Sequence, residues 1–132
     1  MKILLAEQSR AVSFALGRLL EAKGYEVESV YDGVQALERL QKDPFDLLIV
    51  ETDLPRIDGR ALVKSAKMRA VKVPTIGILP TSEVTRKDLA ESEGIDALLP
   101  KPYFAKELLS LINALAGGAK AEGLSPMTVI RR

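Results

Sequence analysis

The chain has 132 residues, of which 47% are hydrophobic and 28% charged, as expected for one globular domain with its own core. A formal net charge of +1 gives no reason to expect a nucleic-acid or membrane surface, and the absence of cysteine and histidine excludes disulfides, thiolate or imidazole metal sites and histidine-based catalysis. No apolar run reaches the roughly 18 residues of a spanning helix and no signal peptide is recognisable, so we expect a cytoplasmic protein.

Short apolar runs alternate with longer segments of helical period over the first 116 residues. The predicted strands are 3–6, 26–31, 47–50, 75–79 and 95–99. The predicted helices run from a Ser9 cap to Gly24, from an Asp32 cap to Pro44, over a short segment after Gly59, and over 85–93 and 106–116. Five strand-then-helix units predict an α/β fold, with a five-stranded parallel sheet and helices on both of its faces.

The first predicted helix and the end of the chain carry two further expectations. Hydrophobic residues on one side of that helix predict its buried face, namely Val12, Leu16, Leu19 and Leu20. Beyond Ala116 neither helical nor strand period is visible, so we expect one domain at 1–116 and a flexible tail or linker at 117–132.

Polar residues follow several of the predicted strands. Glu7 and Gln8 come after the first strand, Glu51 and Asp53 after the third, and Lys101 after the fifth. A single charged residue in such a place is usually only solvated. In a parallel sheet, however, the carboxyl ends of the strands meet at one edge, where ligands of such folds bind. The cluster therefore predicts a site at this edge.

Three fragments, 3–9, 46–59 and 94–103, carry a specific resemblance. On them the chain resembles the CheY-like receiver domains of two-component response regulators. The resemblance implies a flavodoxin-like, doubly wound (βα)5 fold and a signalling module rather than an enzyme. Family members use an acidic pair after the first strand to help hold a divalent cation, and an aspartate after the third strand to take phosphate. A hydroxyl after the fourth strand, a lysine after the fifth and an aromatic residue on the fifth complete the pattern.

The sequence departs from this pattern at most positions. Glu51 stands at the phosphoacceptor position, Gln8 replaces an acidic metal ligand, Leu79 replaces the hydroxyl, and Leu98 replaces the aromatic residue. Only Lys101 is retained. An amide adds no charge to hold a cation, so we expect weak magnesium binding at most and no other cofactor.

The resemblance therefore implies a degenerate receiver, or pseudo-receiver, with no catalytic residue and a degenerate acidic pocket of Glu7, Gln8 and Asp53. In this interpretation Glu51 pairs with Lys101 and either mimics the phosphorylated state or switches nothing. The expected partners are other signalling proteins, including a second copy, bound through the face formed by segments 85–93, 95–99 and 106–116. Neither nucleic acid nor membrane is expected as a partner.

Two alternatives stay open. The first is a working phosphoacceptor receiver with a remodelled site, in which Asp53 accepts phosphate or Thr81 and Ser82 supply the missing hydroxyl. The second is a small flavodoxin-like enzyme or nucleotide binder, although no glycine-rich phosphate loop follows any predicted strand.

Overall fold

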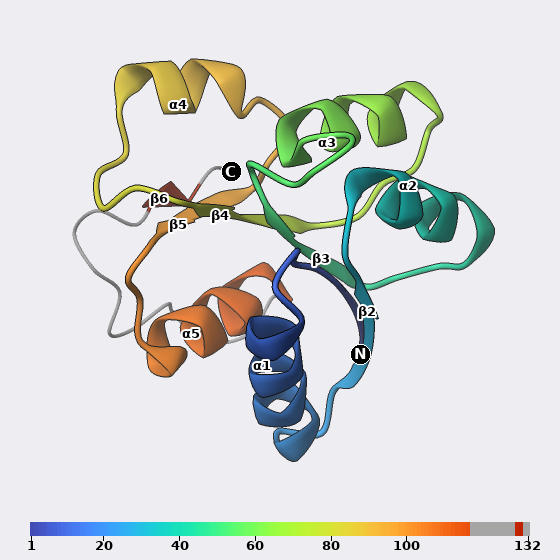
Figure 1. Cartoon of the computed structure of the whole chain (residues 1–132), viewed down its shortest axis with the longest axis vertical. Helices are drawn as coiled ribbons and strands as arrows, with labels where there is room; N and C mark the ends of the chain where they lie inside the picture. Colours follow the sequence, from blue (N-terminus) through green and yellow to red (C-terminus); the bar gives the residue numbers. More distant parts are fainter. Residues whose placement is uncertain (117–128, 131–132) are drawn as a thin grey trace.

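The computed structural model describes residues 1–116 and the backbone of 129–130. Strands and helices alternate along the chain (Figure 1). The strands are β1 (Lys2–Ala6), β2 (Glu26–Val30), β3 (Leu47–Glu51), β4 (Thr75–Leu79), β5 (Ala97–Pro100) and β6 (Val129–Ile130). The helices are α1 (Arg10–Ala22), α2 (Gly33–Lys42), α3 (Gly59–Met68), α4 (Arg86–Glu91) and α5 (Ala105–Leu115).

One sheet forms the centre of the molecule, with strand order β2-β1-β3-β4-β5-β6. β1 to β5 are parallel. Helices α1 and α5 cover one face, and α2, α3 and α4 cover the other (Figure 1). This confirms the predicted doubly wound α/β fold.

β6 lies beyond Ala116, in the segment where the sequence shows neither helical nor strand period. Val129 and Ile130 pair antiparallel with Leu98 and Ala97 on the outer edge of β5. A two-residue strand is too short to show an alternating pattern, so no pattern in the sequence predicts it. The predicted flexibility of 117–128 and 131–132 concerns residues outside the described part of the chain.

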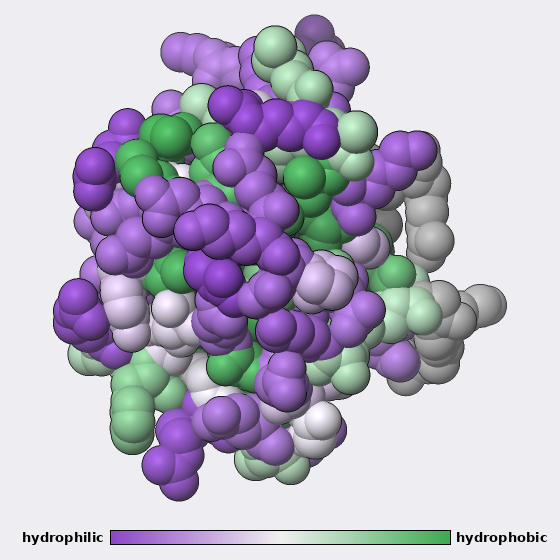
Figure 2. All heavy atoms as spheres, turned by 90° about the vertical axis from the view of Figure 1, so that its right-hand side faces the viewer, coloured by the Kyte–Doolittle hydropathy of each residue, from purple (hydrophilic) through white to green (hydrophobic). Residues whose placement is uncertain are grey.

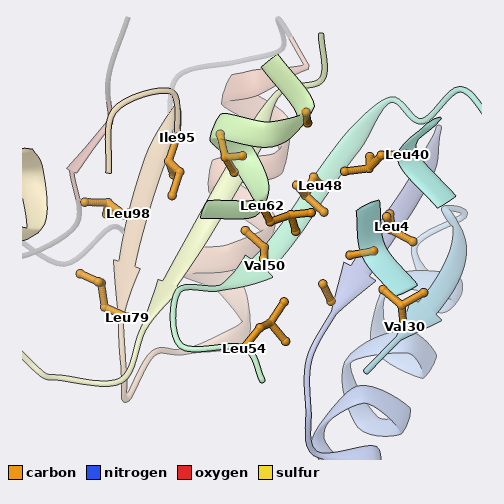
Figure 3. Packing of buried hydrophobic residues seen from close by; sticks show 14 residues of the cluster. Leu4, Val30, Leu40, Leu48, Val50, Leu54, Leu62, Leu79, Ile95 and Leu98 are labelled. Atoms are coloured by element: carbon orange, nitrogen blue, oxygen red, sulfur yellow. The ribbon is translucent and has the colours of Figure 1, made fainter. Parts of the chain in front are cut away.

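Alternating side chains of the central strands build a core on each face of the sheet. On the α1 and α5 side the strands contribute Ile3, Leu5, Ile49, Ile76 and Ile78, and on the other side Leu4, Leu48, Val50, Leu79 and Leu98. Figure 3 shows the second cluster, with Leu79 and Leu98 close together on neighbouring strands. The central strands β1, β3, β4 and β5 are therefore buried on both faces over almost their whole length.

The predicted buried face of α1 is wrong at Val12, which is 39% exposed. The helix instead turns Ser13, Gly17 and Leu20 inward. The Ser13 hydroxyl lies 2.9 Å from the hydroxyl of Ser29 on β2 and hydrogen-bonds it. Because this bond satisfies a buried polar group, the small residues can pack against the sheet and Val12 moves outward.

Helix α4 is short and has no buried residue of its own. Arg60 on α3 connects the two helices, since its guanidinium lies 3.0 Å from Asp88 on α4 and 3.2 Å from the hydroxyl of Ser92. Asp88 also accepts a hydrogen bond from the backbone N–H of Thr85, the cap residue of α4. These polar contacts, together with the partly buried Val84 and Leu89, hold α4 over the sheet.

The face of the molecule seen in Figure 2 is mostly hydrophilic, with hydrophobic residues showing in separate areas. Within residues 1–116 and 129–130, no helix has both the length and the apolar character needed to cross a bilayer.

Candidate functional site

The residues predicted to meet at the carboxyl edge of the sheet do so in part. Glu51 is the last residue of β3, and Glu7 and Lys101 directly follow β1 and β5. Backbone hydrogen bonds fix the last two, from Glu7 N–H to the Val30 carbonyl at 3.1 Å and from Lys101 N–H to the Leu79 carbonyl at 3.0 Å. Gln8 and Asp53 lie at the same edge but are exposed.

The end of β3 is held by the first turn of α3. The N–H of Gly59 donates to the carbonyl of Thr52 at 3.0 Å, and Thr52 N–H donates to Ile78 on β4. A Cβ atom at position 59 would lie 2.3 Å from the Glu51 carbonyl oxygen. Only glycine allows this approach, so the helix packs directly against the backbone that presents Glu51.

Both oxygens of the Glu51 carboxylate are engaged. Oε1 accepts a hydrogen bond from the Gln8 N–H at 3.0 Å, and Oε2 lies 3.0 Å from Nζ of Lys101. Lys101 Nζ is also 3.8 Å from Glu7 Oε1, while Glu7 Oε2 accepts from Ser9 N–H at 2.8 Å. Glu51 is 5% exposed and Glu7 is 4% exposed, whereas Lys101 is half-buried. The site is thus a compact group of two buried carboxyls and one ammonium.

The two carboxyl groups differ in their affinity for a proton. Burial and a hydrogen bond with Glu51 raise the pKa of Glu7 from 4.5 to about 7. Burial also acts to raise the pKa of Glu51, but hydrogen bonds with Glu7, the Gln8 N–H and Lys101 outweigh it and lower that pKa. As the pH falls, therefore, Glu7 takes up a proton before Glu51, and Glu51 remains the carboxylate that pairs with Lys101.

The basic and phenolic groups respond to the same charges. Burial disfavours the ammonium form of Lys101, but the hydrogen bond and charge of Glu51 outweigh this and raise the pKa of Lys101. Burial, with the negative charges of Glu7 and Glu51, raises the pKa of Tyr103 to about 12. Tyr103 therefore stays a neutral phenol, and the pair Glu51–Lys101 stays charged at neutral pH.

The shifted pKa of Glu7 predicts that stability falls as the pH rises from about 4.5 to 7. In this range Glu7 binds a proton more strongly in the folded chain than in the unfolded chain. Raising the pH therefore disfavours the folded state relative to the unfolded state. We expect a loss of about 1–3 kcal/mol in the free energy of unfolding across this range. The lowered pKa of Glu51 acts in the opposite direction but only below about its ordinary value, 4.5. Chemical denaturation at several pH values measures the profile.

The matched variant is Glu7→Gln, which keeps the size of the side chain and cannot titrate. It should flatten the profile between pH 4.5 and 7, while Glu38→Gln at an exposed position should leave it unchanged. The chain has no histidine to titrate in this range. A wild-type profile that is already flat would show that Glu7 is ionised in the folded protein.

The residues present do not fit a tightly held divalent cation. The Lys101 ammonium contacts both buried carboxyls, and neither oxygen of Glu51 is free of a hydrogen-bond partner. Gln8 offers a neutral amide. Within the described residues, no three acidic, histidine or cysteine side chains are grouped so that they could hold a metal ion. A cation would have to displace the lysine from both carboxyls.

Leu79 and Leu98 lie in the core beneath the site. They are 1% and 0% exposed and belong to one hydrophobic cluster (Figure 3). Thr81, the nearest alternative hydroxyl in the sequence, is exposed and donates to the Glu83 carbonyl at 3.1 Å. No described interaction brings it to Glu51.

Thr52 is a neighbour of the site that was not predicted from the sequence. It is 2% exposed and its hydroxyl lies 3.4 Å from the Ile78 carbonyl. Its place directly after Glu51 was the available signal, because it continues a buried strand into the loop. The raised pKa of Glu7 was also not predicted, because it depends mainly on burial of the side chain, which no sequence motif indicates.

Comparison with known proteins identifies the family. The model of the response regulator receiver domain matches residues 3–113. The chain belongs to the response regulator receiver domain family. Receiver domains of this family are modules of two-component signalling.

The curated relatives are response regulators. The response regulator MprA of Mycobacterium avium is 33% identical over 122 residues, and that of Mycobacterium leprae is 34% identical over 122 residues. Each alignment covers 92% of this chain and 54% of the relative. The receiver chain thus spans about half the length of the curated relatives that it matches.

Solved receiver domains have the same fold. The receiver domain of the Francisella response regulator 1452 superposes with a TM-score of 0.81 at 23% identity, covering 88% of this chain and 96% of that one. The chemotaxis protein CheY4 of Vibrio cholerae gives 0.79 at 28% identity, covering 86% and 97%. The receiver domain of the sensor histidine kinase PA1611 from Pseudomonas aeruginosa, solved with magnesium in its active-site cleft, gives 0.78 at 25% identity, covering 89% and 98%.

Proposed function

We propose that this receiver domain signals by binding other proteins and does not accept phosphate. The observation that carries the proposal is the contact of Glu51 with Lys101 at 3.0 Å, completed by the Gln8 N–H on the other carboxylate oxygen. Glu51, at the phosphoacceptor position, thus forms a charge pair with Lys101 that does not require phosphorylation. We infer that the pair biases the domain towards one conformation.

The chemistry of the site supports this proposal. Transfer to a carboxylate needs an oxygen free to attack and positive charge around the phosphoryl group as it moves. In this site the glutamate is one methylene longer than aspartate, and such a displacement of about 1 Å is enough to impair catalysis. Both of its oxygens already accept hydrogen bonds, and the side chain at the hydroxyl position, Leu79, is in the core.

The proposed partners are other signalling proteins, and the proposed surface is the α4–β5–α5 face, with β6 lying along the outer edge of β5. Helix α4 exposes Arg86, Lys87 and Glu91, and α5 begins beside the exposed Phe104 and Lys106. The mixture of charges with an aromatic side chain suits a protein partner. A second copy of the chain is one such partner. We propose neither nucleic acid nor a membrane as partner.

Acyl-phosphate labelling tests the proposal. After incubation with acetyl phosphate and magnesium, the intact mass of the native chain should stay unchanged. Glu51→Asp alone should also remain unlabelled, because Gln8 and Leu79 still lack the ligand and the hydroxyl. Detectable labelling is expected only for Gln8→Asp with Glu51→Asp and Leu79→Thr, since losses of ligand and hydroxyl affect different parts of the transition state.

The matched control carries Gln8→Asp, Glu51→Asn and Leu79→Thr, and its lack of labelling would assign the adduct to residue 51. Circular dichroism must first show that each variant is folded. A phosphate adduct on the native chain would overturn the proposal. Efficient labelling of Glu51→Asp alone would show that another group already supplies the missing contacts.

A further inference from the structure

A cavity lies at the edge of the sheet opposite to Glu51. It has a volume of about 530 Å³, is open to solvent on one side, and is lined by the start of β3 and β4, the end of α3, and the loop before β5. Leu48 and Thr75 pair at the amino ends of β3 and β4, whereas Glu51 and Ile78 pair at the other ends of the same strands. The volume falls within the range of small-molecule sites, and nothing in the proposed function uses it.

The cavity exists because small residues lie where α3 ends. Ala66 is 3% exposed on the buried side of α3 and lines the cavity with Val63. Ala70 follows the helix with a positive φ of 60° and turns the chain, so that Val71 and Val73 form another wall. Protein interiors are otherwise close-packed, so a larger side chain at position 66 would fill this space.

The walls are apolar and their polar groups are satisfied. Asp96 accepts a hydrogen bond from Thr75 N–H at 2.7 Å, and the Thr75 hydroxyl donates to the Val73 carbonyl at 3.0 Å. The only carboxylate that lines the cavity is thus bound to backbone. A ligand here would meet mainly hydrocarbon, without displacing a water from an unpaired polar group of these two residues.

Two lysines provide charge at the cavity. Lys67 and Lys72 are exposed and line it, and the end of the Lys67 side chain lies beside Gly94, 2.9 Å from where a Cβ would be. Within residues 1–116, neither ammonium group has an ion-pair partner. Because Asp96 is the one acid among the lining residues, the two lysines leave the cavity with an excess of positive charge beside its apolar walls.

We propose that this cavity binds a small amphipathic anion, a carboxylate on a short hydrocarbon chain. The chain lies against the half-buried Val71 and Val73, with Ala66 at the base of the cavity, and the carboxylate lies between Lys67 and Lys72. Burial of the hydrocarbon provides most of the affinity, and the lysines select an anion over a neutral or cationic head. Unlike the proposed function, this inference depends on no residue of the Glu51 site.

The test uses the full chain and octanoate as the probe, with thermal unfolding and backbone amide NMR as readouts. Octanoate should raise the unfolding temperature and shift the amides of Leu48, Ala66 and Gly94 while leaving those of Gln8 and Glu51 unchanged. Octanol should bind about tenfold more weakly, and octylamine and acetate should give no response at the same concentration. Equal binding of octylamine, or shifts confined to the Glu51 site, would overturn the proposal.

Two variants distinguish the contribution of the cavity volume to octanoate binding from the contribution of the lysine charges. Ala66→Leu should abolish the octanoate response, and it should raise the unfolding temperature without ligand if the leucine fits the space. Lys67→Gln combined with Lys72→Gln should bind octanoate and octanol equally. If Ala66→Leu does not fold, the amide shifts of the wild-type chain still decide the matter. Unchanged octanoate binding in a folded Ala66→Leu chain would place the ligand elsewhere.

Discussion

Replacing Leu79 by alanine is expected to lower the free energy of unfolding by about 2–5 kcal/mol, the usual range for truncating a buried leucine. Leu79 is 1% exposed and lies in the cluster that includes Leu54, Ile95 and Leu98. Alanine removes these contacts, and the surrounding strands can collapse only in part. Urea unfolding monitored by circular dichroism measures the change.

Leu79→Met is the matched control, because it conserves volume and should cost less than about 1.5 kcal/mol. Leu79→Thr should be nearly as harmful as alanine, since it removes hydrocarbon and buries a hydroxyl. A loss below about 1 kcal/mol for Leu79→Ala would contradict this packing. Such a small loss would indicate that the Leu79 side chain points into the solvent-filled site near Glu51 and not into the hydrophobic core.

Replacing Lys101 by methionine is expected to lower the free energy of unfolding by about 1–3 kcal/mol at pH 7. Methionine keeps the hydrocarbon stem but leaves the Glu51 carboxylate, 5% exposed, without its cation. Removing one member of a fully buried pair costs about 3–5 kcal/mol. The expected loss is smaller here because the Lys101 side chain is 36% exposed and partly screened by water.

A double-mutant cycle with Glu51→Gln isolates this effect. Lys101→Met should be far less harmful in the Glu51→Gln chain, because no carboxylate is then left unpaired at position 51. The loss of unfolding free energy caused by Lys101→Met alone should also become smaller at low pH. Without the ammonium group the pKa values of the Glu7 and Glu51 carboxyls rise, and once protonated these carboxyls carry no charge that a cation must balance. Equal losses in both backgrounds, at every pH, would show that the lysine contributes only packing.

The order of the five strands and five helices within residues 1–116 could be predicted because strands and helices differ in period and several helices begin at a capping residue. Ser9 and Asp32 accept the predicted hydrogen bonds from Val12 N–H and Gln35 N–H at the starts of α1 and α2. The sequence did not predict which side of a helix is buried where tertiary contacts determine it. Val12 is exposed because the Ser13–Ser29 hydrogen bond turns the helix, and neither residue signals that contact by its own spacing.

The sequence predicted which charged residues of the candidate site meet, but not their pKa values. The parallel sheet required Glu7, Glu51 and Lys101 to meet, and the structure places them in contact. The roles assigned to Gln8, Asp53, Leu79 and Leu98 remain predictions. The protonation of Glu7 could not be predicted, because it results from burial and from sharing a hydrogen bond with Glu51. The cavity beside Ala66 could not be predicted from the sequence either, because an alanine in a helix does not indicate which residues pack against it.

The two edges of the sheet are protected in different ways. A strand edge with free N–H and carbonyl groups can recruit a strand from another molecule and so begin aggregation. At one edge β6 occupies the backbone groups of Ala97 and Leu98. At the other edge β2 carries the charged residues Glu26 and Glu28, and Glu28 forms an ion pair with Arg39 of α2. An added strand would have to dislodge β6 or place its own side chains beside these charges, so the native chain should resist fibril formation at either border.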